Sequence, residues 1–230
     1  MKINLTYYGH STFGLEIGDH QLLIDPFISG NPNIDLSPEE LEADYILVTH
    51  GHGDHVGDTV PIAKRTGAQA IACFEVANWL EAKGVEVHPQ HIGGGFHHPF
   101  GYLKMTQALH GSALPDGSYG GMPGGFLITT PDDYRIYIAG DTGLFPGMSL
   151  IGEEDIDFAA LPIGDNFTMG PDDALRAVKM IQPDMVIPSH YNTFDVIQQD
   201  PLAWKKRVES ATDTMAVVLN PLDTLSLQEE

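Results

Sequence analysis

The stretch Thr49-His50-Gly51-His52-Gly53-Asp54-His55 gathers three imidazoles and one carboxylate directly after an apolar segment that is predicted to be a strand over residues 45–49. Imidazole and carboxylate are ligands that suit Zn, Fe, Mn and Ni. The two glycines permit tight backbone turns, so the four side chains can face one cavity. A chance cluster on a polar loop is the alternative, but the alternation of His-x-His-x-Asp-His favours chelation. The candidate metal ligands of this stretch are His50, His52, Asp54 and His55.

One such cluster cannot complete two coordination spheres, so further ligands are expected at the ends of other strands. Three residues meet this condition, because His110, Asp141 and His190 each follow an apolar segment. Any one of them alone would more often be a capping or packing residue. Their common placement at strand ends favours an active site, as is typical of α/β proteins. We therefore expect all three to be metal ligands.

The pattern along the chain predicts strands followed by α/β alternation, and it predicts this arrangement twice. Apolar runs bounded by Gly, Pro and Asp indicate the strands, and amphipathic runs indicate the helices. The expected strands cover residues 3–8, 12–17, 21–25, 45–49, 68–73, 102–109, 125–130, 134–139, 158–163, 185–188 and 215–219. The expected helices cover residues 59–66, 75–83, 171–181 and 201–209. No linker separates the halves, so one domain over residues 1–230 is expected.

The charge of the chain is strongly negative, with 11 Lys and Arg against 32 Asp and Glu and a formal net charge of -21. Such a chain repels phosphate backbones unless a local basic groove overrides the field, so nucleic acid is not expected as a partner. No apolar run reaches the roughly 20 residues of a membrane span, so no membrane association is expected. A single cysteine, Cys73, excludes an intramolecular disulfide and fits a reducing compartment. A cytoplasmic location is expected.

Together these motifs resemble the metallo-β-lactamase superfamily of hydrolases. The resemblance runs from end to end through His50-x-His52-x-Asp54-His55, His110, Gly140-Asp141 and His190. More narrowly, the chain is similar to the uncharacterised metal-dependent hydrolases related to ascorbate-6-phosphate lactonase. The segments that carry this narrower resemblance are Gly9-His10-Ser11, Asp25-Pro26-Phe27, Gly140 to Phe145, Pro162 to Gly170 and Ser189-His190-Tyr191.

The resemblance implies a four-layer αββα sandwich of two similar halves, with the site at the edge between two sheets. It implies that His50, His52 and His110 bind a first metal, that Asp54, His55 and His190 bind a second, and that Asp141 bridges them. Zinc is the default metal for such a site, and manganese, iron or nickel could occupy the same ligands. Two metals can share a hydroxide that attacks an ester, lactone or phosphoester-type small molecule.

Other functions are compatible with the same scaffold. A non-enzymatic metal-binding or sensor protein is one alternative, and a nuclease of the same superfamily is another. Nuclease relatives usually carry an inserted nucleic-acid-binding domain, and no insertion is visible in this sequence. A redox diiron relative usually has Glu at the position of His52 and an attached flavin module, and neither is present. The sequence leaves open whether the chain forms a homo-oligomer.

Several residues outside the expected ligand set are candidates for roles near the site. Asp54 and His10 are the candidate catalytic residues. Asp54 could orient the nucleophile, and His10 ends the first strand and could bind substrate, with a hydrogen-bonded structural histidine as the alternative. Asp25 is a candidate acceptor for a ligating imidazole, with a turn residue before Pro26 as the alternative. Tyr191 could donate to a substrate oxygen or pack. His97 and His98 are expected in an exposed loop, and His20, His88 and His91 are expected to face solvent.

Overall fold

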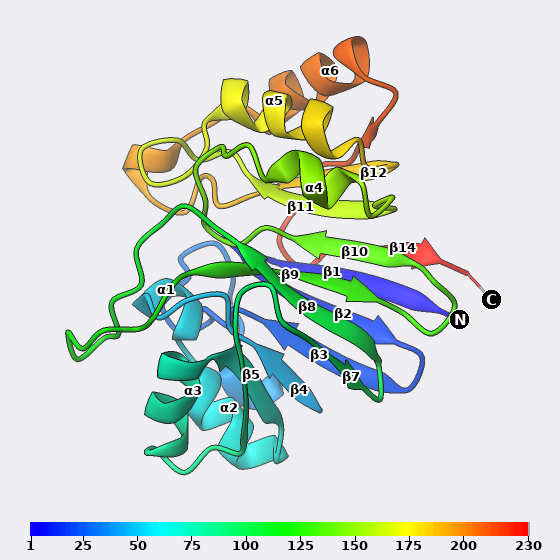
Figure 1. Ribbon diagram of the computed structural model, residues 1–230. Helices are drawn as coiled ribbons and strands as arrows, with labels where there is room; N and C mark the ends of the chain where they lie inside the picture. The colour runs from blue at the N-terminus through cyan, green and yellow to red at the C-terminus, as the bar shows by residue number, and fades with distance from the viewer. Residues whose placement is uncertain (230) are drawn as a thin grey trace.

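The computed structural model describes residues 1–229, and these form two β-sheets that pack face to face with helices on their outer faces (Figure 1). The first sheet has the strand order β14-β1-β2-β3-β4-β5-β6. Its strands are β1 (Ile3–Gly9), β2 (Thr12–Ile17), β3 (His20–Ile24), β4 (Tyr45–Leu47), β5 (Gln69–Cys73), β6 (Val87–Gln90) and β14 (Thr224–Gln228). The strands from β3 to β6 are parallel to one another, and the remainder are antiparallel.

The second sheet repeats this plan with the order β13-β12-β11-β10-β9-β8-β7. Its strands are β7 (Gly95–His98), β8 (Gly101–Gln107), β9 (Gly124–Thr129), β10 (Arg135–Ile138), β11 (Phe158–Pro162), β12 (Met185–Ser189) and β13 (Met215–Ala216). The strands from β10 to β13 are parallel. Every residue of β11 is buried, as expected for a parallel strand that is covered on both faces.

Helices cover the outer face of each sheet, so the molecule has four layers in the order α, β, β, α (Figure 1). The helices are α1 (Gly53–Val56), α2 (Thr59–Thr66), α3 (Phe74–Glu81), α4 (Met148–Gly152), α5 (Pro171–Ile181) and α6 (Pro201–Ala211). Short 3-10 turns cover Pro38–Glu40 and Asp195–Ile197. None of the helices within residues 1–229 has the length and apolar content needed to cross a membrane.

Helix α5 illustrates why these segments fold as they do. Pro171 at the first turn has the fixed φ that helices require, and its missing N–H costs nothing there. Four buried residues, Ala174, Ala177, Val178 and Ile181, recur at helical spacing and pack on the second sheet. The other core cluster joins the facing sides of both sheets and also includes residues of α2 and α3. The αββα sandwich implied by the resemblance is therefore confirmed.

The structure differs from the predicted elements in several places. Strands β6, β7 and β14 and the short helices α1 and α4 were not predicted, and the last predicted strand, over residues 215–219, is only two residues long. The chain instead returns to the first sheet as β14, which pairs antiparallel with β1. His98 does not lie in an exposed loop but at the end of β7, where its side chain is buried against Phe100. His97 is exposed as expected, but it also lies in β7 and not in a loop.

Candidate metal centre

The expected ligands come together because the strands that precede them end at the same edge of the sandwich. His50 follows β4, and Asp25 follows the neighbouring strand β3 of the same sheet. In the second sheet Asp141 follows β10 and His190 follows β12. Parallel strands present their carboxyl ends at one edge, and loops at that edge of an α/β sheet form binding sites. The two sheets thus each contribute side chains to one centre.

A first group of donors consists of His50, His52 and His110, whose ligand atoms lie within 4.8 Å of one another. The Nε2 atom of His50 lies 2.9 Å from the Nδ1 atom of His52. The His110 ring is centred 5.0 Å from each of the other two rings. His50 is fully buried and the other two are partly exposed, so this group opens toward solvent.

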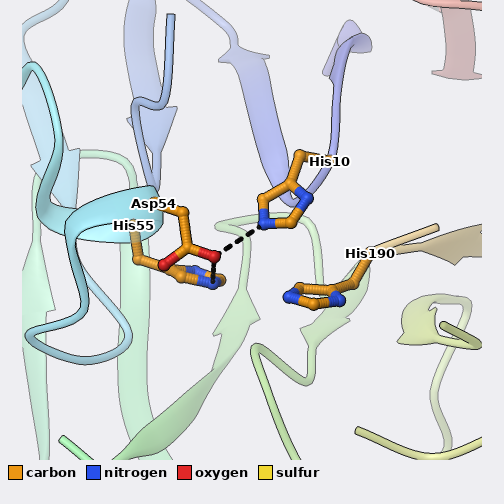
Figure 2. Close-up of side chains that lie close together, drawn as sticks. All are labelled: His10, Asp54, His55 and His190. Atoms are coloured by element: carbon orange, nitrogen blue, oxygen red, sulfur yellow. Dashed lines mark hydrogen bonds and ion pairs between the residues drawn. The ribbon is translucent and has the colours of Figure 1, made fainter. Parts of the chain in front are cut away.

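A second group consists of His10, Asp54, His55 and His190, again with ligand atoms within 4.8 Å of one another (Figure 2). Asp54 and His55 come from the short helix α1, where they directly follow Gly53. The Oδ2 atom of Asp54 lies 3.1 Å from His10 Nε2 and 3.9 Å from His55 Nε2. The grouping therefore contains the three residues assigned to the second metal by resemblance, and it adds His10.

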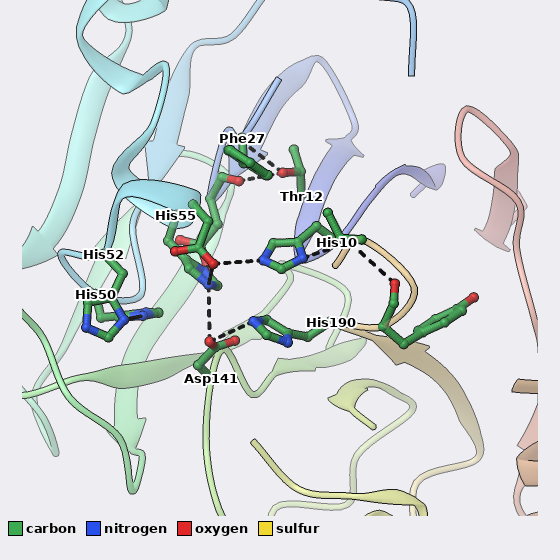
Figure 3. A network of polar contacts seen from close by, with 12 residues as sticks. His10, Thr12, Phe27, His50, His52, His55, Asp141 and His190 are labelled. Carbon is green, nitrogen blue, oxygen red and sulfur yellow. Dashed lines mark hydrogen bonds and ion pairs between the residues drawn. The ribbon is translucent and has the colours of Figure 1, made fainter. Parts of the chain in front are cut away.

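Asp141 lies between the two groups (Figure 3). Its Oδ2 atom lies 3.0 Å from His190 Nε2, 3.3 Å from His55 Nε2 and 3.5 Å from His110 Nε2. A third set of close donors, formed by His50, His55 and Asp141, links the groups. One carboxylate oxygen surrounded by three imidazoles from both groups has the position that a bridging ligand needs.

The donor set fits divalent metal ions on the evidence of its unpaired atoms. Within residues 1–229, the buried atoms His55 Nε2 and Asp141 Oδ1 have no hydrogen-bond partner. A buried polar atom without a partner costs free energy, and a site for an ion is one explanation for it. Imidazole and carboxylate donors in clusters of this kind suit first-row divalent metals.

Asp25 holds the fully buried ring of His55 from behind. Its Oδ2 atom accepts a hydrogen bond from His55 Nδ1 at 2.8 Å and another from the Thr49 hydroxyl at 2.6 Å. Its Oδ1 atom accepts from the Thr49 backbone N–H at 2.8 Å. This leaves His55 Nε2 facing the centre, which is the arrangement of a carboxylate–histidine–metal triad. The Thr49 hydroxyl also lies 3.0 Å from His50 Nδ1. The sequence did not point to this role of Thr49.

His10 is held through both its ring and its backbone. Its Nδ1 atom lies 2.9 Å from the Thr193 hydroxyl, and its backbone carbonyl accepts from the His190 N–H at 2.7 Å. His10, Asp25 and His190 all have left-handed backbone conformations, with φ of 55°, 46° and 53°. Such conformations are costly for residues other than glycine, and they cluster at functional sites. Nothing in the sequence pointed to Thr193, because its contact joins residues 183 positions apart.

The pKa values of His10, His50 and Asp141 favour the deprotonated states that metal ligation requires, whereas that of His55 favours its protonated form. Burial lowers the pKa of His50 well below its usual value and that of His10 to about 4. Burial alone would raise the pKa of Asp141, but the neighbouring His55 and His190 hold it well below its usual value. Burial would likewise lower the pKa of His55, yet Asp141 and Asp25 raise it. A cation that replaces the proton on His55 would satisfy the same carboxylates.

Tyr191 does not join the donors, although it follows His190 directly. It is largely buried, and it lines a surface cavity together with Tyr7, Leu202 and Leu219. That cavity includes none of the metal-ligand candidates. Packing, the second of the two roles considered for Tyr191, is the one that its surroundings favour.

The fold and the donor set together define a four-layer αββα protein with His and Asp donors gathered at the edge between its sheets. The family model of the β-lactamase superfamily domain matches residues 20–191. A UPF0173 metal-dependent hydrolase from Bacillus thuringiensis subsp. konkukian is 50% identical over 216 residues, which is 91% of this chain and 95% of the relative. The corresponding protein of Anoxybacillus flavithermus is 53% identical over 90% of this chain and 94% of its own length.

Among solved structures, the metallo hydrolase Igni18 from the hyperthermophilic archaeon Ignicoccus hospitalis has a TM-score of 0.92 and 37% identity, with full coverage of both chains. The chain therefore belongs to the metal-dependent hydrolases of the metallo-β-lactamase superfamily.

Proposed function

We propose that the chain hydrolyses an ester, lactone or phosphoester-type small molecule with two divalent metal ions. The observation that carries this proposal is the convergence of two groups of His and Asp donors, one of three and one of four side chains, with Asp141 between them. His50, His52 and His110 would hold the first ion. Asp54, His55 and His190 would hold the second, and Asp141 would contribute to both. Zinc is the metal we propose first, with manganese, iron or nickel as ions that the same ligands accept.

When bound, such a pair of ions supplies a hydroxide nucleophile at neutral pH and polarises the substrate oxygen. The protein's own groups then have to hold the donors and the substrate in place. Asp25 fixes the ring of His55, and Asp54 is fixed by its contact with His10. In the tautomer that carries its proton on Nε2, His10 donates to Asp54 and its Nδ1 atom accepts from the Thr193 hydroxyl. Preorganised donors of this kind are a major source of rate enhancement.

Metal content measured on purified protein tests the proposal. We expect about two equivalents in the wild type, since two-metal sites of this class bind both ions. His110→Ala and His190→Ala should each lose one ion, and Asp141→Ala should weaken both. His91→Ala is the control, because His91 is exposed and outside the donor groups.

Turnover separates an enzyme from a sensor on the same scaffold. Hydrolysis of ester, lactone and phosphodiester probes should be lost on chelation and restored by metal. Binding of two ions without any turnover would favour the sensor, and binding of no ion after reconstitution would overturn the metal assignment.

A further inference from the structure

We propose that Phe27 and Phe194 form an aromatic seat for an uncharged, phenyl-sized group of the substrate beside the metal centre. The preferred substrates are then neutral compounds with an aromatic or comparably apolar acyl group rather than phosphorylated or carboxylated ones. This inference rests on the proposed function and adds the substrate class to it.

The two phenyl rings border the second donor group directly. Phe27 and Phe194 have ring centroids 5.4 Å and 5.5 Å from the His10 ring, each in an edge-to-face arrangement. The two phenyl rings are centred 6.3 Å apart. The same His10 ring contacts Asp54 through Nε2 and lies 4.2 Å from the ring of His190. A group lying against the phenyl rings is therefore within one side chain of the metal ligands.

The position of Phe27 is fixed by its local structure (Figure 3). Its backbone N–H donates to the Thr12 hydroxyl at 3.0 Å, and that hydroxyl donates to the carbonyl of Asp25. Gly30 leaves room for the ring, since a Cβ atom there would lie 2.4 Å from Phe27 Cε2. An aromatic surface held rigidly beside a site binds a ligand with little loss of conformational entropy.

Phe194 faces solvent although it lies beside a buried cluster. It is 38% exposed, whereas its neighbour Thr193 is buried and holds His10. A single exposed aromatic residue is ordinary. Two aromatic rings that converge on His10, which contacts the candidate ligand Asp54, are better explained as a binding surface, because ligand pockets combine apolar walls with a few placed polar groups.

The charges around the centre favour a neutral ligand tail. Three carboxylates, from Asp25, Asp54 and Asp141, surround the donors. Among residues 1–229, the Lys and Arg side chains that form ion pairs do so with acidic residues outside the centre, such as Lys104 with Glu154 and Arg207 with Asp172. These carboxylates would repel an anionic tail, while an apolar tail gains from contact with the rings.

Binding of three hydroxamic acids to the metal-loaded protein tests this proposal by calorimetry, independently of turnover. Acetohydroxamic acid carries only the metal-chelating group, phenylacetohydroxamic acid adds a phenyl ring, and succinic monohydroxamic acid adds a carboxylate. We expect the phenyl compound to bind about tenfold more tightly than acetohydroxamic acid, since burial of a ring is worth about 1–2 kcal/mol. The carboxylate compound should bind no more tightly than acetohydroxamic acid.

Two alanine variants test whether the tighter binding of the phenyl compound depends on Phe27 and Phe194. Phe194→Ala and Phe27→Ala should each reduce the tenfold preference to less than threefold while the affinity for acetohydroxamic acid stays unchanged. Phe96→Ala is the matched control, because Phe96 is an exposed phenyl side chain that contacts His88 and His98 instead of the centre. It should keep the full preference. Metal content is measured in every sample.

The outcomes test the aromatic seat and the proposed function separately. Two bound ions with equal affinities for all three compounds would overturn the aromatic seat and leave the proposed function standing. A preference that survives both alanine variants, or a preference for the carboxylate compound, would do the same. A protein that binds neither metal nor any hydroxamic acid would overturn the proposed function and the substrate class together.

Discussion

Asp25 is a buried carboxylate outside the donor groups, and its hydrogen bonds position the candidate ligand His55. It accepts three hydrogen bonds, and only the one from His55 Nδ1 bears on the centre directly. Asp25→Asn keeps the shape but removes the charge, and its amide cannot accept from every donor now present. We expect metal affinity to fall about 10- to 100-fold, as is typical for partners of ligating histidines. Competition with a metal-sensitive dye measures this directly.

Asp58→Asn is the control for that substitution. Asp58 also accepts several hydrogen bonds, from Ile28 N–H, Ser29 N–H and the Ser29 hydroxyl, but it does not contact the centre. It should lower the free energy of unfolding and leave metal affinity within about twofold. Equal metal affinities in the two variants would show that the Asp25–His55 contact is only structural.

The ring of His10 positions Asp54 through Nε2 while Thr193 fixes its other nitrogen. His10→Ala should lower kcat by about 100-fold, comparable to the loss of one well-placed hydrogen-bond donor. Thr193→Val should cost less, about tenfold, because the ring remains. Steady-state kinetics at saturating metal provides the measurement. A change in KM alone for both variants would assign His10 to substrate binding instead.

At the scale of elements, the turn after β10 delivers Asp141 to the centre. Gly140 has a φ of 62°, and a Cβ atom there would lie 2.9 Å from Thr49 Cβ. Gly140→Ala should therefore destabilise the protein by about 2 kcal/mol or more, since the left-handed conformation alone costs an alanine 1–2 kcal/mol. Displacement of Thr49 and Asp141 should also weaken metal binding. Urea unfolding and metal titration measure the two effects.

Gly67→Ala measures the cost of a left-handed backbone conformation without the steric clash that Gly140→Ala adds. Gly67 has a φ of 80°, but a Cβ atom there would meet nothing within 4 Å. Its cost should stay near 1 kcal/mol, which is the backbone term, and metal binding should be unaffected. If both variants lose the same stability, the close approach to Thr49 is without consequence.

The edge strands β6 and β7 carry a buried imidazole outside the metal centre. Burial, and the nearby His88, lower the pKa of His98 to about 4 from its ordinary value of 6.5. Between these two values the unfolded chain binds a proton that the folded chain does not, so the free energy of unfolding falls as the pH drops from 6.5 to 4. His98→Phe, which keeps the stacking on Phe100, should lessen this fall. Urea unfolding at pH 7 and pH 5 compares the two proteins, and parallel pH dependences would contradict the prediction.

The elements also show what the sequence could and could not predict. Fully buried strands such as β11 and amphipathic helices such as α5 carry a periodic pattern, and their predicted bounds agree with the structure within one residue. Strand β7 carries no such pattern, because three of its four residues are exposed at the edge of a sheet. Strand β14 depends on a partner more than 200 positions away, and no local signal reports that pairing.

The same distinction applies to the candidate site. Residues at strand ends could be predicted to converge, because parallel strands present their ends at one edge. The contacts of Thr193 and Phe194 with His10 could not, since they depend on how a loop after β12 folds back on the end of β1.

At the scale of the whole molecule, the donors bridge the two sheets. His50, His52, Asp54 and His55 follow a strand of the first sheet, and His110, Asp141 and His190 follow strands of the second. Bound metal should therefore stabilise the packing of one sheet on the other. Metal at about 1,000 times its Kd adds about 4 kcal/mol to the free energy of unfolding. In a chain of this size that corresponds to a rise in Tm of about 10 °C. Calorimetry with and without chelator measures it, and an unchanged Tm would mean that the ions do not link the sheets.

The return of β14 to the side of β1 has a consequence for recombination between relatives. Residues 3–90 and 224–228 make up one sheet, while residues 95–216 make up the other, so the units of structure are not contiguous in the gene. A single crossover with the Bacillus relative near residue 92 would pair β1 of one parent with β14 of the other. Two crossovers, with the second between β13 and β14, would pass on each sheet whole from one parent.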